Sequence, residues 1–225
     1  MTKTERAAKA HELLKILYPD AVCSLDFDPE KVYELLISVR LAAQCTDARV
    51  NIVTKVLFDK YRSMQEFAEA KLEDVEEIVK PCGFYHMKAK DIIAMCRELI
   101  ERYDGVVPDS IDELITLSGV GRKTANLIVG DVYGKDSVVT DTHCIRICGR
   151  LGLTTGITEP VKVEMALRKI LDLSESGDFC HRLVLFGRDV CTARAPKCGE
   201  CPLKEVCEVG PDAPKAKKSK KKETV

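Results

Sequence analysis

The sequence predicts an all-α protein, because apolar residues recur at helical spacing through most of the chain and scarcely any stretch alternates as a strand would. Val32, Leu35, Leu36 and Val39 are a typical example, since they fall on one face of a helix. Only residues 137–140 suggest extended backbone, and so short a stretch cannot found a sheet. A chain of 225 residues is ample for one or two domains with an apolar core.

Each predicted helix is supported by its own apolar period, and two have a capping signal at the start. Ser110 precedes Glu113 by three residues, which is the pattern of a capping box. Asp141 follows an apolar run and stands where an N-cap is expected. In chain order, we expect helices over residues 30–43, 47–61, 72–80, 87–103, 110–117, 122–133, 142–151, 160–171 and 178–190.

The net charge of -1 conceals an uneven distribution. Residues 212–225 carry six lysines against Asp212 and Glu223, so this tail contributes +4 and the rest of the chain -5. An acidic body attracts a polyanion only through a local basic face, whereas the tail adds non-specific attraction for phosphate. A disordered, solubilising end explains the same composition.

Nothing in the sequence marks the chain for export or for a membrane. Residues 1–10 are polar and charged, and no stretch reaches the ~18 apolar residues that a membrane span needs. We therefore expect a cytoplasmic protein in a reducing environment, in which the eleven cysteines are not disulfide staples.

Four of the cysteines are closely spaced near the C-terminus, in a segment with little helical period. Soft thiolates on a short loop suit an iron–sulfur cluster or a tetrahedral zinc ion, and the spacing alone does not choose between them. Arg194 and Lys197 lie on the same loop, where they either contact phosphate or are ordinary exposed charges. The other seven cysteines are expected to pack as small apolar residues. The candidate ligands, in the pattern C-x6-C-x2-C-x5-C, are Cys191, Cys198, Cys201 and Cys207.

A glycine-rich turn within residues 117–126 joins two predicted helices and provides a candidate phosphate site. Gly119 and Gly121, on either side of Val120, allow positive φ and leave backbone N–H groups uncovered. The second helix begins with its N-terminus pointing the same way, and this combination binds anions. The pattern is that of a helix–hairpin–helix, although a plain tight turn with exposed cations has the same residues.

Lys123 falls in the first turn of that second helix, where the positive helix end disfavours an ammonium group. A lysine amine can attack an electrophilic sugar carbon and form a Schiff base, although Lys123 taken alone also fits a surface lysine. A short return after the helix can bring Asp141 beside Lys123. A carboxylate there would stabilise the cationic sugar that forms as a base departs, and the alternative role for Asp141 is helix capping.

Taken together, these motifs resemble those of a known family. The hairpin, Lys123, Asp141 and the four cysteines occur in the order found in endonuclease III, over residues 1–210. The resemblance implies an all-α, two-lobed helix–hairpin–helix DNA glycosylase fold with one [4Fe–4S] cluster per chain. The implied parts are a six-helix domain at 25–135 with the helix–hairpin–helix at about 111–130, a cluster domain made of 1–24 and 136–211, and a basic disordered tail at 212–225.

The resemblance also implies roles for single residues. Lys123 would be the nucleophile and Asp141 its acidic partner. Gln44, in the segment Leu-Ala-Ala-Gln-Cys-Thr-Asp, would enter the space left by a flipped base. Phe84 would wedge into the duplex, unless it packs in the core. Ser118 departs from the family, which usually has proline there, and this change should loosen the hairpin slightly.

The implied activity is that of a bifunctional DNA glycosylase and AP lyase, which removes oxidised pyrimidines and cleaves the strand 3′ to the abasic site by β-elimination. Its partner would be double-stranded DNA with damaged bases or abasic sites, bound by a monomeric, nucleoid-associated enzyme. A mismatch adenine glycosylase shares the fold and cluster but lacks lysine at the position of Lys123. A non-catalytic DNA-binding module would need the hairpin but not Lys123 and Asp141 together. An electron carrier would need only the cluster.

Overall fold

Every regular element in the computed structural model, which describes residues 1–209, is helical, and no strand occurs among those residues. The predicted all-α class is therefore confirmed. The chain divides into two units. Cys23–Val139 form the hairpin unit, and Met1–Val22 together with the residues from Thr140 onward form the loop unit. The basic tail predicted at 212–225 lies outside the described residues.

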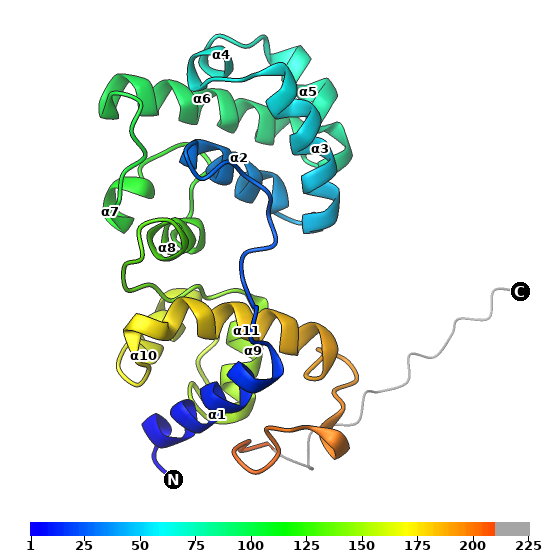
Figure 1. The fold of residues 1–225 in the computed structure, drawn as a ribbon, viewed down its shortest axis with the longest axis vertical. Helices are drawn as coiled ribbons and strands as arrows, with labels where there is room; N and C mark the ends of the chain where they lie inside the picture. The colour runs from blue at the N-terminus through cyan, green and yellow to red at the C-terminus, as the bar shows by residue number, and fades with distance from the viewer. Residues whose placement is uncertain (210–225) are drawn as a thin grey trace, which may run out of the picture. The chain divides into compact units, whose positions relative to one another are not determined.

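The hairpin unit contains α2 (Val32–Ala42), α3 (Asp47–Lys60), α4 (Met64–Ala68), α5 (Leu72–Val79), the 3₁₀ turn η1 (Lys80–Cys82), α6 (Tyr85–Tyr103), α7 (Ile111–Leu114) and α8 (Arg122–Asp131). The long helix α6 is its centre, since α4, α5 and α2 all pack against it (Figure 1). Helix α2 also contacts α3 and α8, and α7 packs on α8. The turn between α7 and α8 is thereby held against a fixed core.

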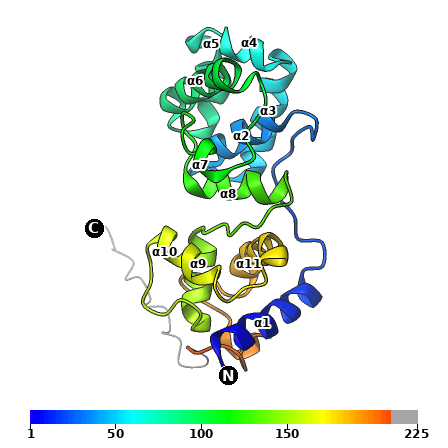
Figure 2. The same cartoon turned by 90° about the vertical axis from the view of Figure 1, so that its left-hand side faces the viewer.

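The loop unit contains α1 (Lys3–Leu17), α9 (Thr142–Leu151), α10 (Pro160–Leu167), the 3₁₀ turn η2 (Leu173–Glu175), α11 (Ser176–Asp189) and the 3₁₀ turn η3 (Cys198–Glu200). Helix α11 packs against both α9 and α1 (Figure 2). The His11 ring meets the Phe179 ring edge-on at 5.3 Å between centroids, which joins α1 to α11. Segments from opposite ends of the sequence therefore share one core.

The helix boundaries differ from the predicted ones where local hydrogen bonds override the apolar period. α7 ends at Leu114, because the Leu117 N–H already donates to the Leu114 carbonyl and starts the turn. α6 begins at Tyr85, two residues before the predicted start. α1 and α4 were not marked by the apolar period. α1 buries two alanines beside His11 and Leu14, and α4 is only five residues long, so each carries a weak signal.

The core is made largely of aliphatic side chains, as the low aromatic content requires. Of the seven cysteines predicted to pack there, five are buried, namely Cys82, Cys96, Cys144, Cys148 and Cys180. Cys23 and Cys45 are only half-buried, so the prediction of core packing is wrong for these two. Across residues 1–209, the helices are all too short or too polar to traverse a lipid bilayer.

Candidate functional site

The turn between α7 and α8 is seated on a partly buried ion pair. Gly119 has φ of +73°, a conformation that favours glycine. A Cβ atom at Gly119 would lie 2.8 Å from Asp91 Cβ and 2.9 Å from Arg40 Cδ, so no side chain fits. Arg40 on α2 and Asp91 on α6 form an ion pair through Arg40 Nη2 and Asp91 Oδ2 at 2.6 Å. The predicted special role of Gly119 thus has a steric basis as well as a conformational one.

Ser118 ties the same turn to α6. Its backbone N–H donates to Glu98 Oε2 at 2.7 Å, and its hydroxyl donates to Glu98 Oε1 at 2.6 Å. Hydrogen bonds to a charged acceptor are among the stronger ones in proteins. A proline at position 118 could make neither bond, because it has no N–H and no hydroxyl. That Ser118 loosens the hairpin relative to proline stays a prediction, and the serine anchors the turn through these two bonds.

The N-terminus of α8 presents backbone donors and cations together. Gly121 is the N-cap, and no side chain caps this helix end. The first turn carries no acidic residue, and it holds Arg122 and Lys123. Lys123 is exposed. An uncapped helix N-terminus with neighbouring cations suits an anion such as a DNA phosphate, as the glycine pattern predicted.

Asn126 fixes α8 to the extended segment that follows it, and sequence reasoning missed this residue. Its side chain is 1% exposed. The side-chain nitrogen donates to the Arg122 carbonyl at 3.1 Å, and the side-chain oxygen accepts from the Val138 N–H at 3.1 Å. An asparagine in a helix interior, where it is a poor helix former, was the available signal. Its bonds fix the turn of α8 that bears Lys123.

Cys23 is electrostatically coupled to Lys123 within the hairpin unit. Burial raises the pKa of the Cys23 thiol to about 11, with Asp131 and Asp47 raising it further and Lys123 opposing the shift. At neutral pH this sulfur is a thiol, and a thiol is a far weaker nucleophile than a thiolate.

Asp141 is the N-cap of α9. Its φ and ψ of -93° and -178° are extended, and Oδ1 accepts from the Cys144 N–H at 2.7 Å. The capping role weighed from the sequence is therefore present in the structure. Capping occupies one carboxylate oxygen and fixes the side chain at the helix end. The partnership of Asp141 with Lys123 stays a prediction, since the two residues belong to different units.

Gln44 and Phe84 lie on two exposed turns of the hairpin unit and share an unusual backbone conformation. Gln44 has φ of +57° and Phe84 has φ of +49°, so both are left-handed although neither is glycine. Such residues are strained and tend to occur at functional sites. Phe84 is 67% exposed, which excludes the alternative that it packs in the core. An exposed aromatic ring on a strained turn is available to contact a partner.

The four cysteines predicted as ligands line one cavity of the loop unit. Its walls also include Ile147, Leu151, Phe186 and Leu203. Burial raises the pKa of the Cys201 thiol, and the other three cysteines raise it further, so a cationic centre favours the thiolate form of Cys201. In the part of the chain that the structure describes, no three His, Cys, Asp or Glu side chains are close enough to share a single metal ion. Thiolates on a common apolar wall are the donor set of an iron–sulfur cluster.

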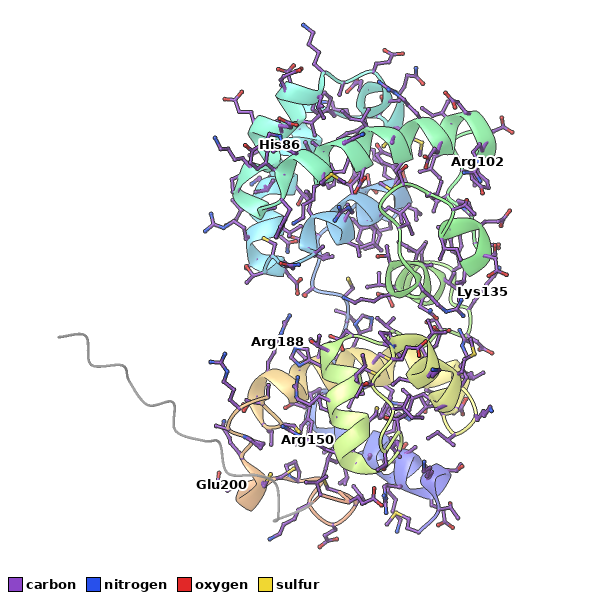
Figure 3. The ribbon with its side chains drawn as sticks, turned by 180° about the vertical axis from the view of Figure 1, so that it is seen from behind. His86, Arg102, Lys135, Arg150, Arg188 and Glu200 are labelled. Atoms are coloured by element: carbon purple, nitrogen blue, oxygen red, sulfur yellow. The ribbon has the colours of Figure 1, made fainter. Side chains whose placement is uncertain are left out.

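Two arginines of α9 hold the start of this loop, with Arg150 labelled in Figure 3. Arg146 Nη2 donates to the Cys191 carbonyl at 3.1 Å, and Arg150 Nη1 donates to the Thr192 carbonyl at 2.8 Å. Arg150 Nη1 also lies 3.3 Å from Cys191 Sγ. Sequence reasoning missed both arginines, which look like ordinary helix-surface charges.

The two cations predicted on the loop itself differ in their surroundings. Arg194 and Lys197 are both exposed. Lys197 Nζ lies 3.6 Å from Asp189 Oδ1, an exposed ion pair that contributes little to stability. Both side chains are therefore accessible to a phosphate, which is compatible with the predicted contact and with ordinary surface charge.

Two family models match this chain. Residues 37–172 match the model of the HhH-GPD superfamily of base excision DNA repair proteins. Residues 191–207 match the iron–sulfur binding domain of endonuclease III. The second match covers the four loop cysteines and decides for an iron–sulfur cluster over zinc.

Similar proteins include curated enzymes that match almost end to end. Endonuclease III of Synechocystis sp. is 42% identical over 207 residues, which cover 92% of this chain and 93% of the relative. Endonuclease III of Bacillus subtilis is 40% identical over 86% of this chain and 88% of its own length. A trapped covalent intermediate of an endonuclease III with DNA superposes with a TM-score of 0.86 at 40% identity, covering 92% of this chain and 97% of that one.

Proposed function

Since this chain belongs to the endonuclease III family, we propose that Lys123 is its nucleophile and that Asp141 assists the departure of the base. The protein is a bifunctional DNA glycosylase and AP lyase of base excision repair, and it removes oxidised pyrimidines. It contains a [4Fe–4S] cluster.

In the proposed reaction, the Lys123 amine attacks the anomeric carbon of the damaged nucleotide. The bond from that carbon to the base breaks, and the base leaves with the bonding electron pair. One amine proton goes to the departed base, the other goes to the ring oxygen as the sugar ring opens, and the product is a Schiff base between Lys123 and the sugar. Removal of a proton from the neighbouring sugar carbon then expels the 3′ phosphate by β-elimination, and water releases Lys123.

Asp141 has the charge that this sequence of steps requires. The sugar becomes cationic as the base departs, and a nearby carboxylate stabilises such a species. The cap bond from the Cys144 N–H fixes the orientation of the Asp141 carboxylate, so little reorganisation is needed during the reaction. Because asparagine is an equally good N-cap, the charge of Asp141 can be removed with little loss of stability.

The DNA contacts we propose come from the strained turns and the hairpin. Gln44 enters the space left by the flipped base, and Phe84 wedges into the stack beside it. The backbone of Gly119, Val120 and Gly121 binds a phosphate at the N-terminus of α8. Positive charge in that first turn and the absence of a capping side chain on α8 support this assignment.

The cluster holds the loop on which two further DNA contacts lie. Cys191, Cys198, Cys201 and Cys207 would be its ligands, and when bound it fixes a segment that has almost no core of its own. Arg194 and Lys197 would then contact phosphates from a rigid loop. We further propose that the enzyme acts as a monomer in the cytoplasm, close to the nucleoid, on double-stranded DNA with damaged bases or abasic sites.

The observation that carries the proposal is that Lys123 is exposed in the first turn of α8, directly after the hairpin. No side chain caps this end of the helix. Reduction with borohydride during reaction with oxidised-pyrimidine DNA would convert its Schiff base into a stable crosslink. Formation of that crosslink by the wild-type protein, and its loss with Lys123, tests the assignment.

A further inference from the structure

Lys88 is a lysine buried to 1% exposure in the first part of α6. Its ammonium donates three hydrogen bonds, to the carbonyls of Leu41 at 2.8 Å, Ala43 at 2.7 Å and Cys82 at 2.9 Å. An ammonium has three donors, so every one is satisfied. All three acceptors are backbone oxygens from segments that lie outside α6.

The three carbonyls belong to the two segments that lead into the strained turns. Leu41 and Ala43 are at the C-terminal end of α2, directly before Gln44. Cys82 ends η1, directly before Gly83 and Phe84. Lys88 therefore joins a segment 45 residues away along the chain to one 6 residues away.

A positive charge suits this position for electrostatic reasons. The last carbonyls of a helix have no partner within it, and they form the negative end of its dipole. In α2 the Lys88 ammonium takes the place of the missing donors. Burial lowers the pKa of Lys88, and the positive charge of Arg40 lowers it further. An apolar side chain here would avoid the cost of desolvating a charge, but it would leave these three carbonyls without their donor.

We propose that Lys88 is a positioning residue, which locks the Gln44 turn and the Phe84 turn into one rigid pair so that both enter the DNA together. The inference rests on the proposed DNA roles of Gln44 and Phe84. Both residues occupy left-handed backbone that is costly to maintain, and such strain persists only where the surroundings fix it. Three hydrogen bonds from one ammonium fix the approaches to both turns at once.

The proposal predicts a selective defect in Lys88→Met, which keeps the length of the side chain and removes its charge. Lys90→Met is the matched control, because Lys90 lies two residues away on α6 and is exposed. Each variant is titrated onto undamaged duplex and onto the same duplex with a tetrahydrofuran abasic analogue. A 2-aminopurine opposite the analogue reports unstacking of that base by its fluorescence. Thermal melting of each variant checks its fold.

For Lys88→Met we expect unchanged binding to undamaged DNA relative to Lys90→Met. Preference for the abasic analogue should fall by at least roughly tenfold, because the free energy of one charge-assisted hydrogen bond corresponds to about a tenfold change in an equilibrium constant. The rise in 2-aminopurine fluorescence should be lost as well. If Lys88→Met keeps both the preference and the fluorescence of Lys90→Met, the proposal is wrong.

A second measurement decides the matter if Lys88→Met does not fold. Gln44→Ala, Phe84→Ala and the double variant are compared in the otherwise wild-type protein. Turns that act as one pair should give a double variant no worse than the more damaging single variant. If the two fold-losses simply multiply, the turns act separately and the proposal fails. Borohydride trapping of the wild-type protein and of Lys123→Ala is scored separately, so a wrong assignment of Lys123 would be recognised as such.

Discussion

Ser118 donates both its backbone N–H and its hydroxyl to the two carboxylate oxygens of Glu98, at 2.7 and 2.6 Å. This arrangement joins the turn between α7 and α8 to the central helix α6. Gly119 follows directly and rests on the Arg40–Asp91 pair. Two contacts with charged groups therefore hold the turn that carries the proposed phosphate site. One is the bonding of Ser118 to Glu98, and the other is the packing of Gly119 on the Arg40–Asp91 pair.

Ser118→Ala removes one of the two hydrogen bonds to Glu98, and we expect it to lower the free energy of unfolding by about 1 kcal/mol. In a Glu98→Ala background the same substitution should have almost no effect, because its partner is already gone. Urea unfolding of the four proteins measures both values. An equal cost of Ser118→Ala with and without Glu98 would show that the contact is not what matters.

Gly119→Ala should cost about 1–3 kcal/mol, because the new Cβ meets Arg40 and Asp91 and φ is positive. Gly121→Ala is the natural comparison, since its φ of -95° is ordinary and nothing lies within 4 Å of an added Cβ. There we expect a loss of at most about 1 kcal/mol, from replacing a glycine N-cap. Thermal unfolding separates the two substitutions, and comparable losses would refute the steric account.

Asp141→Asn keeps a side-chain cap for α9 and removes the negative charge. Base excision should therefore fall by at least ~10², a typical cost of one electrostatic group, while stability changes little. Asp141→Ala should in addition lose about 1 kcal/mol of stability. Single-turnover excision and unfolding are measured on the same samples. Full activity of Asp141→Asn per folded molecule would reduce Asp141 to a cap.

Deleting residues 212–225 removes six lysines and two acidic residues. Each phosphate that a protein neutralises adds about -0.9 to the slope of log affinity against log salt concentration. We expect weaker binding to undamaged DNA and a slope flatter by several of these increments, while excision at saturating DNA barely changes. Binding isotherms at several salt concentrations give the slopes, and identical slopes would mean that the tail is only a solubilising end.

Much of the fold was predictable because local sequence patterns, namely apolar periods and capping residues, determine where its helices lie. Helix α9 begins and ends as predicted at Thr142 and Leu151, since a capping residue and a strong apolar period coincide there. The four cysteines stood out as candidate ligands because their spacing has no role in a core. Whether they hold zinc or an iron–sulfur cluster was not predictable, because both use the same thiolates.

The supports of the site could not be predicted, because they are contacts between distant residues. Lys88 interrupts the apolar face of α6, which is a visible anomaly, but its partners lie up to 47 residues away. The left-handed turns at Gln44 and Phe84 were equally hidden, since neither residue type favours that conformation. The anchoring of Ser118 was hidden for the same reason, since its partner Glu98 lies on another helix.

The central claim is that Lys123 forms the covalent bond to the sugar. The direct measurement is borohydride trapping on a duplex with one oxidised pyrimidine, comparing the wild-type protein with Lys123→Ala and Lys123→Gln. We predict a stable crosslink for the wild-type protein and none for either variant, while both variants still bind the abasic analogue. A crosslink of wild-type yield in the Lys123 variants would contradict the account and place the nucleophile elsewhere.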